Sequence, residues 1–411
     1  MVHSPPLPRR ILHVDADAFF VGVARLADPE GAGRAPLLIV GGRPGGRGVV
    51  CSASYETRAF GVRSAMPIAR ALRLCPDAMC VPVPPMCGEK SREIRAVLER
   101  WSPMVEGASI DEWYLDLSGT ERLYGDEPLA VTAARIRTAV HEATGLTVSV
   151  GGGPSKLVAK LAVELAKPSR SGTGVHIVDP QQVPGFLDAL PLAAIPGVGP
   201  RAQERLQRHG LVTVADARGL GETALCGLLG ATGGAWLAQR ITGDDTRAVH
   251  PRAARKQISQ ERTFGHDISD DLRLQRRLVA LASRVAIDLR AQQWQCRTIT
   301  VKLRDARFRT STAAHTLSTP VESDRAIRRV VRRLFAVLRE RLPGPVRLIG
   351  VAVSGFGAED AAPTQLGLFA PAPAADGESE RDRQLSRALD RVRARFGDGA
   401  LHLGESEEGA R

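Results

Sequence analysis

The chain has 411 residues, enough for two to four domains with a sizeable apolar core, and its 43% hydrophobic and 25% charged content is ordinary for a soluble globular protein. The longest stretch without a charged residue, 223–239, is too short and glycine-rich to span a membrane, and two Asp interrupt the N-terminal stretch where a signal peptide needs apolar residues. We therefore expect a cytoplasmic protein. Its six Cys form no CxxC pair, so free thiols are expected, and a metal site at Cys75, Cys80 and Cys87 is the less favoured alternative.

Up to about residue 175, strand-like and helix-like patterns alternate, which predicts an α+β arrangement. Strands are expected at 9–15, 49–54, 107–119 and 146–153, and helices at 91–101, 129–143 and 154–167. Residues 183–243 then read as short helices punctuated by glycine. In this part, Gly197 and Gly199 precede a predicted helix whose first backbone N–H groups could bind a DNA phosphate, and a plain tight turn is the alternative. Residues 243–256 resemble an exposed linker.

The next segment is strongly basic. Residues 252–355 carry 22 Lys and Arg against 9 Asp and Glu, a net charge of +13, whereas the rest of the chain sums to −2. This excess indicates a domain that binds a polyanion, although a solvated basic surface without a partner would look similar. The pattern is βαββαβ, with elements expected at 257–264, 270–291, 296–305, 308–317, 325–341 and 346–355. Ile299, Val301 and Leu303 alternate, which predicts a sheet with one face buried by two helices and one polar face.

After Gly355 the sequence becomes a Pro- and Ala-rich linker with one apolar cluster, QLGLF at 365–369, and a helix-like piece at 383–397. Exposed apolar residues in such a linker are unfavourable unless a partner covers them.

Three carboxylates stand out in this basic protein. Asp111 and Glu112 are adjacent in an expected strand, and Asp15 ends the first one. If they converge, they raise one another's pKa unless a cation neutralises them, and Mg²⁺ prefers such oxygens. Two such ions would stabilise a phosphoryl displacement. The alternative is a solvated edge or turn.

Residues suited to phosphate occur nearby in sequence. Ser52, Tyr55 and Arg58 follow at intervals of three, so one turn could present a hydroxyl, a phenol and a guanidinium to a triphosphate, with Lys167 as a further candidate. Without such a ligand they would be a surface Arg beside a half-buried Tyr. No G-x-x-x-x-G-K-[ST] motif occurs, which disfavours a P-loop ATPase.

In this order, the motifs HVDADAFF, SYETRAFGVRSAMP, SIDEWYLD, AKPSRSG and IPGVG, followed by the basic βαββαβ segment, resemble a Y-family (lesion-bypass) DNA polymerase of the bacterial DNA polymerase IV branch. The resemblance covers about residues 8–355. It implies an α+β multidomain right-hand polymerase with a βαββαβ little finger. The implied domains are palm at 1–25 and 83–176, fingers at 26–82, thumb with a helix-hairpin-helix at 177–243, linker at 244–253, little finger at 254–355 and a flexible tail at 356–411.

The resemblance also implies roles for single residues. Asp15, the Ala16 carbonyl, Asp111 and Glu112 match the ligands of two Mg²⁺ ions. The matches to triphosphate contacts are Ser52, Tyr55, Arg58 and Lys167, and Phe20 matches the steric gate against a 2′-hydroxyl. Gln365, Leu366, Leu368 and Phe369 resemble the peptide that binds the bacterial sliding clamp. Asp17 and Asp116 are expected to be structural, hydrogen-bonded supports, and a place directly behind the metal ligands is the alternative for either.

The implied activity is template-directed addition of dNTPs to a primer 3′ end, with low fidelity, in translesion synthesis. The implied partners are primed template DNA, dNTP and the clamp, for a monomer in the cytoplasm and at the nucleoid. The chain departs from the family pattern at the single residues Trp113, Ser54 and Cys87, and its KPSRSG segment at 167–172 is longer than the usual KPNG. A non-catalytic, DNA-binding adaptor and a nucleotide cyclase with a similar palm are the alternatives.

Overall fold

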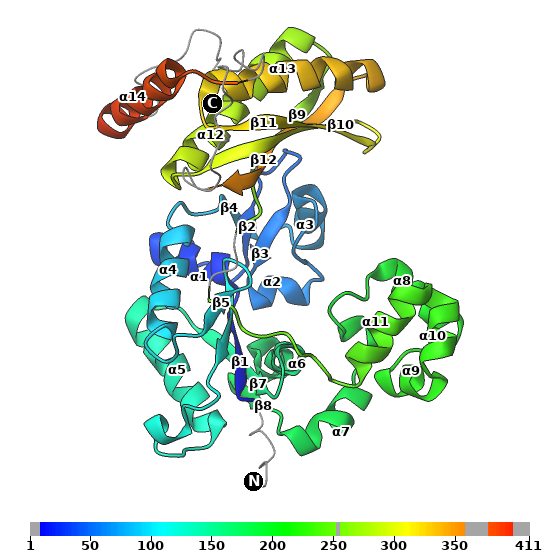
Figure 1. Ribbon diagram of the computed structural model, residues 1–411. Helices are drawn as coiled ribbons and strands as arrows, with labels where there is room; N and C mark the ends of the chain where they lie inside the picture. The colour runs from blue at the N-terminus through cyan, green and yellow to red at the C-terminus, as the bar shows by residue number, and fades with distance from the viewer. Residues whose placement is uncertain (1–8, 252–254, 358–376, 398–411) are drawn as a thin grey trace, which may run out of the picture. The chain divides into compact units, whose positions relative to one another are not determined.

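The computed structural model describes residues 9–251, 255–357 and 377–397 (Figure 1). The chain divides into two compact units, residues 1–253 and 254–411. The first unit contains a five-stranded and a three-stranded sheet, and the second is built on a four-stranded sheet. Among the described residues, no helix is long and apolar enough to cross a membrane.

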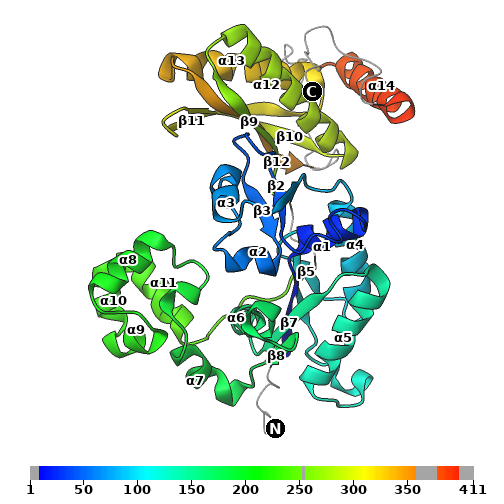
Figure 2. The same ribbon diagram turned by 180° about the vertical axis from the view of Figure 1, so that it is seen from behind.

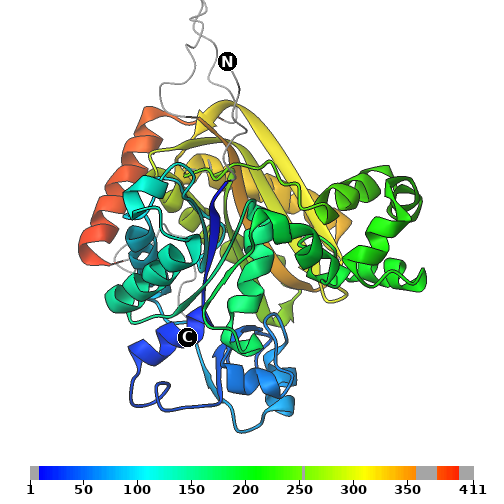
Figure 3. The ribbon, with the colours of Figure 1, turned by 90° about the horizontal axis from the view of Figure 1, so that it is seen from below.

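The five-stranded sheet has the order β5-β6-β1-β7-β8. Its strands are β1 (Ile11–Ala16), β5 (Val105–Gly107), β6 (Glu112–Asp116), β7 (Val148–Gly153) and β8 (Val175–Ile177). Helices α4 (Cys87–Leu98) and α5 (Leu129–Thr144) lie on one face and α6 (Lys156–Ala166) on the other (Figure 3).

Alternation along β1 divides its side chains between these two faces. Leu12 and Val14 are buried in the cluster that includes α4 and α5, so His13 and Asp15 face α6. On β7, Gly151 allows α6 to pack closely, because a Cβ there would lie 2.2 Å from the backbone nitrogen of Val163. The sheet therefore carries an apolar core on one face and polar side chains beside α6 on the other.

The three-stranded sheet has the order β3-β2-β4, with β2 (Leu38–Gly41), β3 (Val50–Ala53) and β4 (Met79–Val81). Around it lie α1 (Phe19–Ala27), α2 (Tyr55–Ala59) and α3 (Ile68–Leu74). Ser54 caps α2: its hydroxyl accepts from the Thr57 N–H at 3.3 Å and donates to the Pro36 carbonyl at 2.7 Å.

A helical cluster completes the first unit. Its helices are α7 (Val183–Asp188), α8 (Pro200–Arg208), α9 (Val214–Leu220), α10 (Glu222–Leu229) and α11 (Ala231–Ile241). Short 3₁₀ turns occur at Glu121–Tyr124, Pro168–Arg170, Pro180–Gln182 and Leu192–Ala194.

The described part of the expected linker, 243–251, has no helix or strand and is largely exposed, but two of its side chains are buried. Asp245 is buried, and its carboxylate accepts from the Leu157 N–H at 3.0 Å. Val249 is fully buried, and the His250 N–H donates to the Glu106 carboxylate at 2.8 Å. The segment therefore contacts α6 through Asp245, β5 through the His250 N–H, and a small apolar cluster through Val249.

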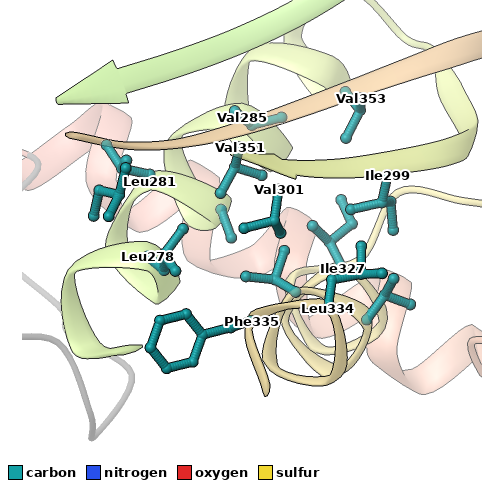
Figure 4. Close-up of a cluster of buried hydrophobic side chains, with 14 of the residues drawn as sticks. Leu278, Leu281, Val285, Ile299, Val301, Ile327, Leu334, Phe335, Val351 and Val353 are labelled. Atoms are coloured by element: carbon teal, nitrogen blue, oxygen red, sulfur yellow. The ribbon is translucent and has the colours of Figure 1, made fainter. Parts of the chain in front are cut away.

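The second unit has the predicted βαββαβ order: β9 (Gln257–Ile268), α12 (Asp271–Ala291), β10 (Gln295–Asp305), β11 (Thr310–Val321), α13 (Asp324–Arg341) and β12 (Val346–Gly357). The sheet is antiparallel in the order β11-β10-β12-β9, and α12 and α13 lie over one face (Figures 1 and 2). Ile299 and Val301 point toward these helices (Figure 4), and Leu303 is fully buried in the same cluster, as predicted.

Within the tail expected to be flexible over 356–411, residues 377–397 contain the helix α14 (Glu380–Phe396), which docks on this unit through polar contacts. The Glu378 carboxylate accepts from the Glu322 and Ser323 N–H groups, and Asp390 forms a bidentate pair with Arg290 at 2.6 and 2.9 Å. Residues 365–369 lie outside the described residues.

Candidate active site

The structure brings the three predicted carboxylates to one end of the five-stranded sheet. Asp15 and Glu112 are direct partners across the antiparallel β1–β6 pair. Asp111 is adjacent, because its carbonyl accepts from the Ala16 N–H at 2.9 Å. Residues separated by 96 positions in sequence are thus neighbours because two strands pair in this register.

The predicted strand at 107–119 is interrupted. The Ala108 and Ser109 N–H groups both donate to the Glu112 carbonyl, at 2.9 and 3.2 Å, so the chain turns there and β6 begins only at Glu112. Asp111 lies in this turn, and its carboxylate accepts from the Ser109 hydroxyl. The two adjacent acids are tolerated locally because one belongs to the turn and the other to the strand.

The carboxylates differ in their electrostatic surroundings. Asp15 is only 8% exposed, and burial raises its pKa to about 6 although the Lys167 ammonium lies 2.9 Å from Oδ2. The His13 imidazole and the Lys160 ammonium, 2.6 Å from Oε2, hold the pKa of Glu112 at about 2. The negative charge of Asp15 is therefore poorly compensated by the protein alone.

A divalent cation fits these residues by their chemistry. Carboxylate and carbonyl oxygens are the donors that Mg²⁺ prefers, and the raised pKa of Asp15 is the signature of a buried charge that a cation would stabilise. In the described ranges, no three His, Cys, Asp or Glu side chains alone converge to enclose an ion. The donor set thus suits an ion that takes further oxygens from a substrate, as Mg²⁺ does with phosphates.

The predicted phosphate-binding residues also come together. Arg58 donates from Nε to the Ala53 carbonyl at 2.9 Å, lies 3.5 Å from the Ser52 hydroxyl and stacks over the Tyr55 ring at 5.0 Å. The Tyr55 hydroxyl donates to Asp17, which follows β1, at 3.4 Å. Burial raises the pKa of Tyr55 to about 12, so its hydroxyl remains protonated and can donate. Asp17 also accepts from the Ser149 hydroxyl at 2.7 Å, in keeping with a supporting role.

Lys167 connects the two groups of residues. It follows α6, and its ammonium contacts both Asp15 and Glu164, which raise its pKa against the opposing effect of burial. Phe20 lies in the first turn of α1, after Ala18 in the left-handed conformation with φ 44°. Its ring is half-buried and meets Phe19 edge-on at 5.4 Å.

Gly197 and Gly199 lie where the sequence places them, before α8. Gly197 has φ 110°, and a Cβ there would lie 2.5 Å from the Trp236 ring, so this turn requires glycine. Gly199 is the residue before α8 begins.

Two polar residues beside Glu112 were missed from the sequence. His13 precedes Asp15 by two positions in a strand and so shares its face, and Lys160 precedes Lys167 by seven, about two helical turns. Both spacings can be read from the sequence and would have predicted that His13 and Lys160 lie on the same face as the carboxylates.

The three single-residue departures from the family pattern are buried in the fold. Trp113 is 2% exposed and, with Cys87, belongs to the cluster on the α4–α5 face of the sheet, opposite to Glu112. Ser54 caps α2, as described above. Each has a structural explanation within the described residues.

Comparison with known proteins identifies the family. The family model "impB/mucB/samB family" matches residues 14–164, and "impB/mucB/samB family C-terminal domain" matches 255–368. DNA polymerase IV of Alkalilimnicola ehrlichii is 40% identical over 85% of this chain and 95% of its own length, and that of Methanoculleus marisnigri is 42% identical over 84% and 94%.

Solved structures agree. A Y-family chimera of Dbh and Dpo4 matches with a TM-score of 0.75 and 26% identity over 85% of this chain and 99% of its own. An insertion ternary complex of Dbh DNA polymerase matches with a TM-score of 0.61 and 26% identity over 84% and 98%. The non-catalytic adaptor is not favoured. The chain belongs to the Y family of DNA polymerases, in the DNA polymerase IV branch, and is a DNA-directed DNA polymerase of lesion bypass.

Proposed function

We propose that Asp15, Asp111, Glu112 and the Ala16 carbonyl hold two Mg²⁺ ions at the end of the five-stranded sheet, which we assign as the palm. The observation that carries this proposal is the pairing of Asp15 with Glu112 across β1 and β6, with Asp111 bonded to Ala16 beside them. When bound, the ions would lower the pKa of the primer hydroxyl and stabilise charge on the phosphates.

The chain's own cations would bind the rest of the nucleotide. Arg58, Tyr55 and Ser52 form one contiguous group, and Lys167 lies against Asp15, so their charges and hydroxyls would meet the triphosphate of a dNTP. As pyrophosphate leaves, the fixed ammonium and guanidinium groups would stabilise its accumulating charge. Asp17 orients Tyr55 by the contact between the phenol and its carboxylate.

Primed DNA would be bound by the remaining parts. We assign residues 26–82, with the three-stranded sheet, to the fingers, the helical cluster within 177–243 to the thumb, and residues 254–355 to the little finger. The little finger's open sheet face carries Lys302 and Arg304 on β10, opposite to its apolar face, and its net positive charge supports contacts to phosphates. Gly197 and Gly199 would present backbone N–H groups to a DNA phosphate. Such binding weakens steeply as salt rises. We expect a monomer acting at the nucleoid in the cytoplasm.

Asp111→Asn tests the assignment. We expect wild type to extend a primer on a template with dNTPs and Mg²⁺, and Asp111→Asn and Glu112→Gln to lose at least about a hundredfold in rate, because each removes charge at the site of phosphoryl transfer. Asp116→Asn is the matched control, since Asp116 lies at the opposite end of β6 and pairs there with Arg9. Full extension by Asp111→Asn and Glu112→Gln would overturn the proposal.

Phe20→Val is expected to admit ribonucleotides. If the half-buried Phe20 ring blocks a 2′-hydroxyl, removing it relieves a clash of about 1–3 kcal/mol, so rNTP incorporation should rise about tenfold or more relative to dNTP. The measurement is single-nucleotide insertion of matched dNTP and rNTP. Phe19→Leu, in the same turn but fully packed in the core, should leave the preference unchanged. An unaltered ratio in Phe20→Val would remove the gate assignment.

The double substitution Leu368→Ala and Phe369→Ala is expected to abolish binding to a bacterial sliding clamp. These side chains would fill an apolar cleft on the clamp, with Leu366 beside them, while Gln365 hydrogen-bonds. Surface plasmon resonance with immobilised clamp measures the loss, and clamp-free primer extension by the variant should equal wild type. Equal clamp binding by both proteins would reject the assignment.

A further inference from the structure

His13 is a buried polar side chain that the proposed chemistry does not use. It lies in the middle of β1, is 0% exposed, and neither ring nitrogen has a hydrogen-bond partner. Its strand neighbours are Tyr114 on β6, whose ring it meets edge-on at 4.6 Å, and Gly151 on β7. An unsatisfied buried polar group costs about 1–3 kcal/mol of folding free energy. An apolar side chain would avoid this cost, so a buried imidazole at this position indicates a further role.

The polar group within reach of His13 is the carboxylate of Glu112. The imidazole Nε2 lies 3.6 Å from Oε2 of Glu112, slightly beyond a hydrogen bond. Lys160 of α6 donates to this same Oε2 at 2.6 Å. Two nitrogen atoms from two different elements therefore converge on one carboxylate oxygen. The other oxygen, Oε1, accepts no hydrogen bond in the described part of the chain.

We infer that His13 and Lys160 are positioning residues that hold Glu112 through Oε2 and thereby leave Oε1 for the divalent cation. The inference rests on the proposed role of Glu112 as a ligand. Hydrogen bonds at active sites are often long without substrate and shorten when the complex forms, so 3.6 Å is compatible with a contact made in the working enzyme. Partners of this kind orient a ligand and raise its affinity for metal.

The chemistry of the two residues is complementary. His13 is fully buried and directs its ring nitrogen Nε2 toward Glu112. Lys160 is about one-third exposed and supplies the positive charge. The His13 ring is rigid and packs against Tyr114 in a paired strand, so it would fix the orientation of the Glu112 carboxylate. The Lys160 ammonium is on a flexible stem and can adjust to the position of that carboxylate.

Binding of Mn²⁺ to the full-length protein, measured by electron paramagnetic resonance without DNA or dNTP, tests this directly. We expect His13→Leu and Lys160→Met each to weaken Mn²⁺ binding about 10- to 100-fold, as loss of a ligand's supporting partner does. His13→Gln keeps a donor and should recover most of the affinity. In primer extension, saturating Mg²⁺ should restore much of the rate in His13→Leu. The matched control is His176→Leu, a half-buried histidine on β8 of the same sheet.

The outcomes separate this inference from the proposed function. If Glu112→Gln abolishes Mn²⁺ binding while folded His13→Leu and Lys160→Met bind as wild type does, the positioning role is wrong and the ligand role stands. If Glu112→Gln itself binds Mn²⁺ and extends primers normally, the ligand assignment fails first. Lys160→Met keeps the test open if His13→Leu does not fold, because Lys160 is partly exposed and packs in no core cluster of the described residues.

Discussion

Asp15→Asn is expected to stop nucleotide addition and, at the same time, to stabilise the metal-free protein. Asp15 is buried, and the difference between its ordinary pKa of 3.8 and about 6 in the folded state corresponds to about 3 kcal/mol of unfavourable charge burial. An Asn removes that charge in nearly the same volume. Activity should fall at least about a hundredfold, because the carboxylate is lost from the reaction site.

The stability difference between Asp15→Asn and wild type depends on pH. The folded state binds the Asp15 proton more tightly than the unfolded chain, so this contribution to stability is fully present below pH 3.8 and is lost as pH rises through about 6. Urea unfolding in EDTA should therefore show Asp15→Asn more stable than wild type at pH 8, with a much smaller difference at pH 4.5. Mg²⁺ at pH 8 should stabilise wild type alone. Equal stabilities at both pH values would contradict the buried-charge explanation.

Arg290→Met is expected to destabilise the second unit, residues 254–411, by about 3–5 kcal/mol. The Arg290 side chain is 4% exposed and pairs with Asp390 of α14 and, at 2.9 Å, with the buried Asp324 of α13. Removing Arg290 leaves buried carboxylates without their main partner. Breaking a buried ion pair in this way lowers the free energy of unfolding far more than replacing the whole pair by apolar residues would. Hydrogen exchange on the full chain, read at α13 and α14, reports the loss.

Arg325→Met is the matched control for this prediction. Arg325 also joins α13 to α14, through a 3.2 Å contact with Asp382, but its side chain is 74% exposed. An exposed pair contributes about 0–1 kcal/mol, so exchange should change little. Adding Asp390→Asn to Arg290→Met should recover part of the loss. If Arg290→Met and Arg325→Met increase hydrogen exchange at α13 and α14 by the same amount, burial of the ion pair does not determine how strongly α14 is attached.

Regular elements and their faces could be predicted from the sequence because their signal is local. The alternation of Ile299, Val301 and Leu303 and the spacing of apolar residues in the two helices predict the βαββαβ unit without any knowledge of partners. The convergence of Asp15 with Glu112 is different. It depends on the register of two strands far apart in the chain, and only the family resemblance predicted it.

Features held together by polar contacts were missed for the same physical reason. Asp245 binds residues 244–251 to α6, the His250 backbone N–H binds them to β5, and Glu378 and Asp390 attach α14. The sequence marks these only as polar residues in a loop or helix. Which polar group finds a partner is decided by tertiary structure, whereas apolar periodicity is decided locally. The turn at 108–111, inside an expected strand, likewise depends on hydrogen bonds to Glu112.

The strand β6 also bears on how this enzyme could be altered. Trp113 and Leu115 lie in the core beneath α4 and α5, whereas Glu112 lies on the opposite face and contacts Lys160 of α6. A library that varies Trp113 and Leu115 together is therefore expected to change thermal tolerance more than the surroundings of Glu112. Trp113 therefore follows the proposed metal ligand Glu112 in sequence but belongs to the core on the other face of the sheet.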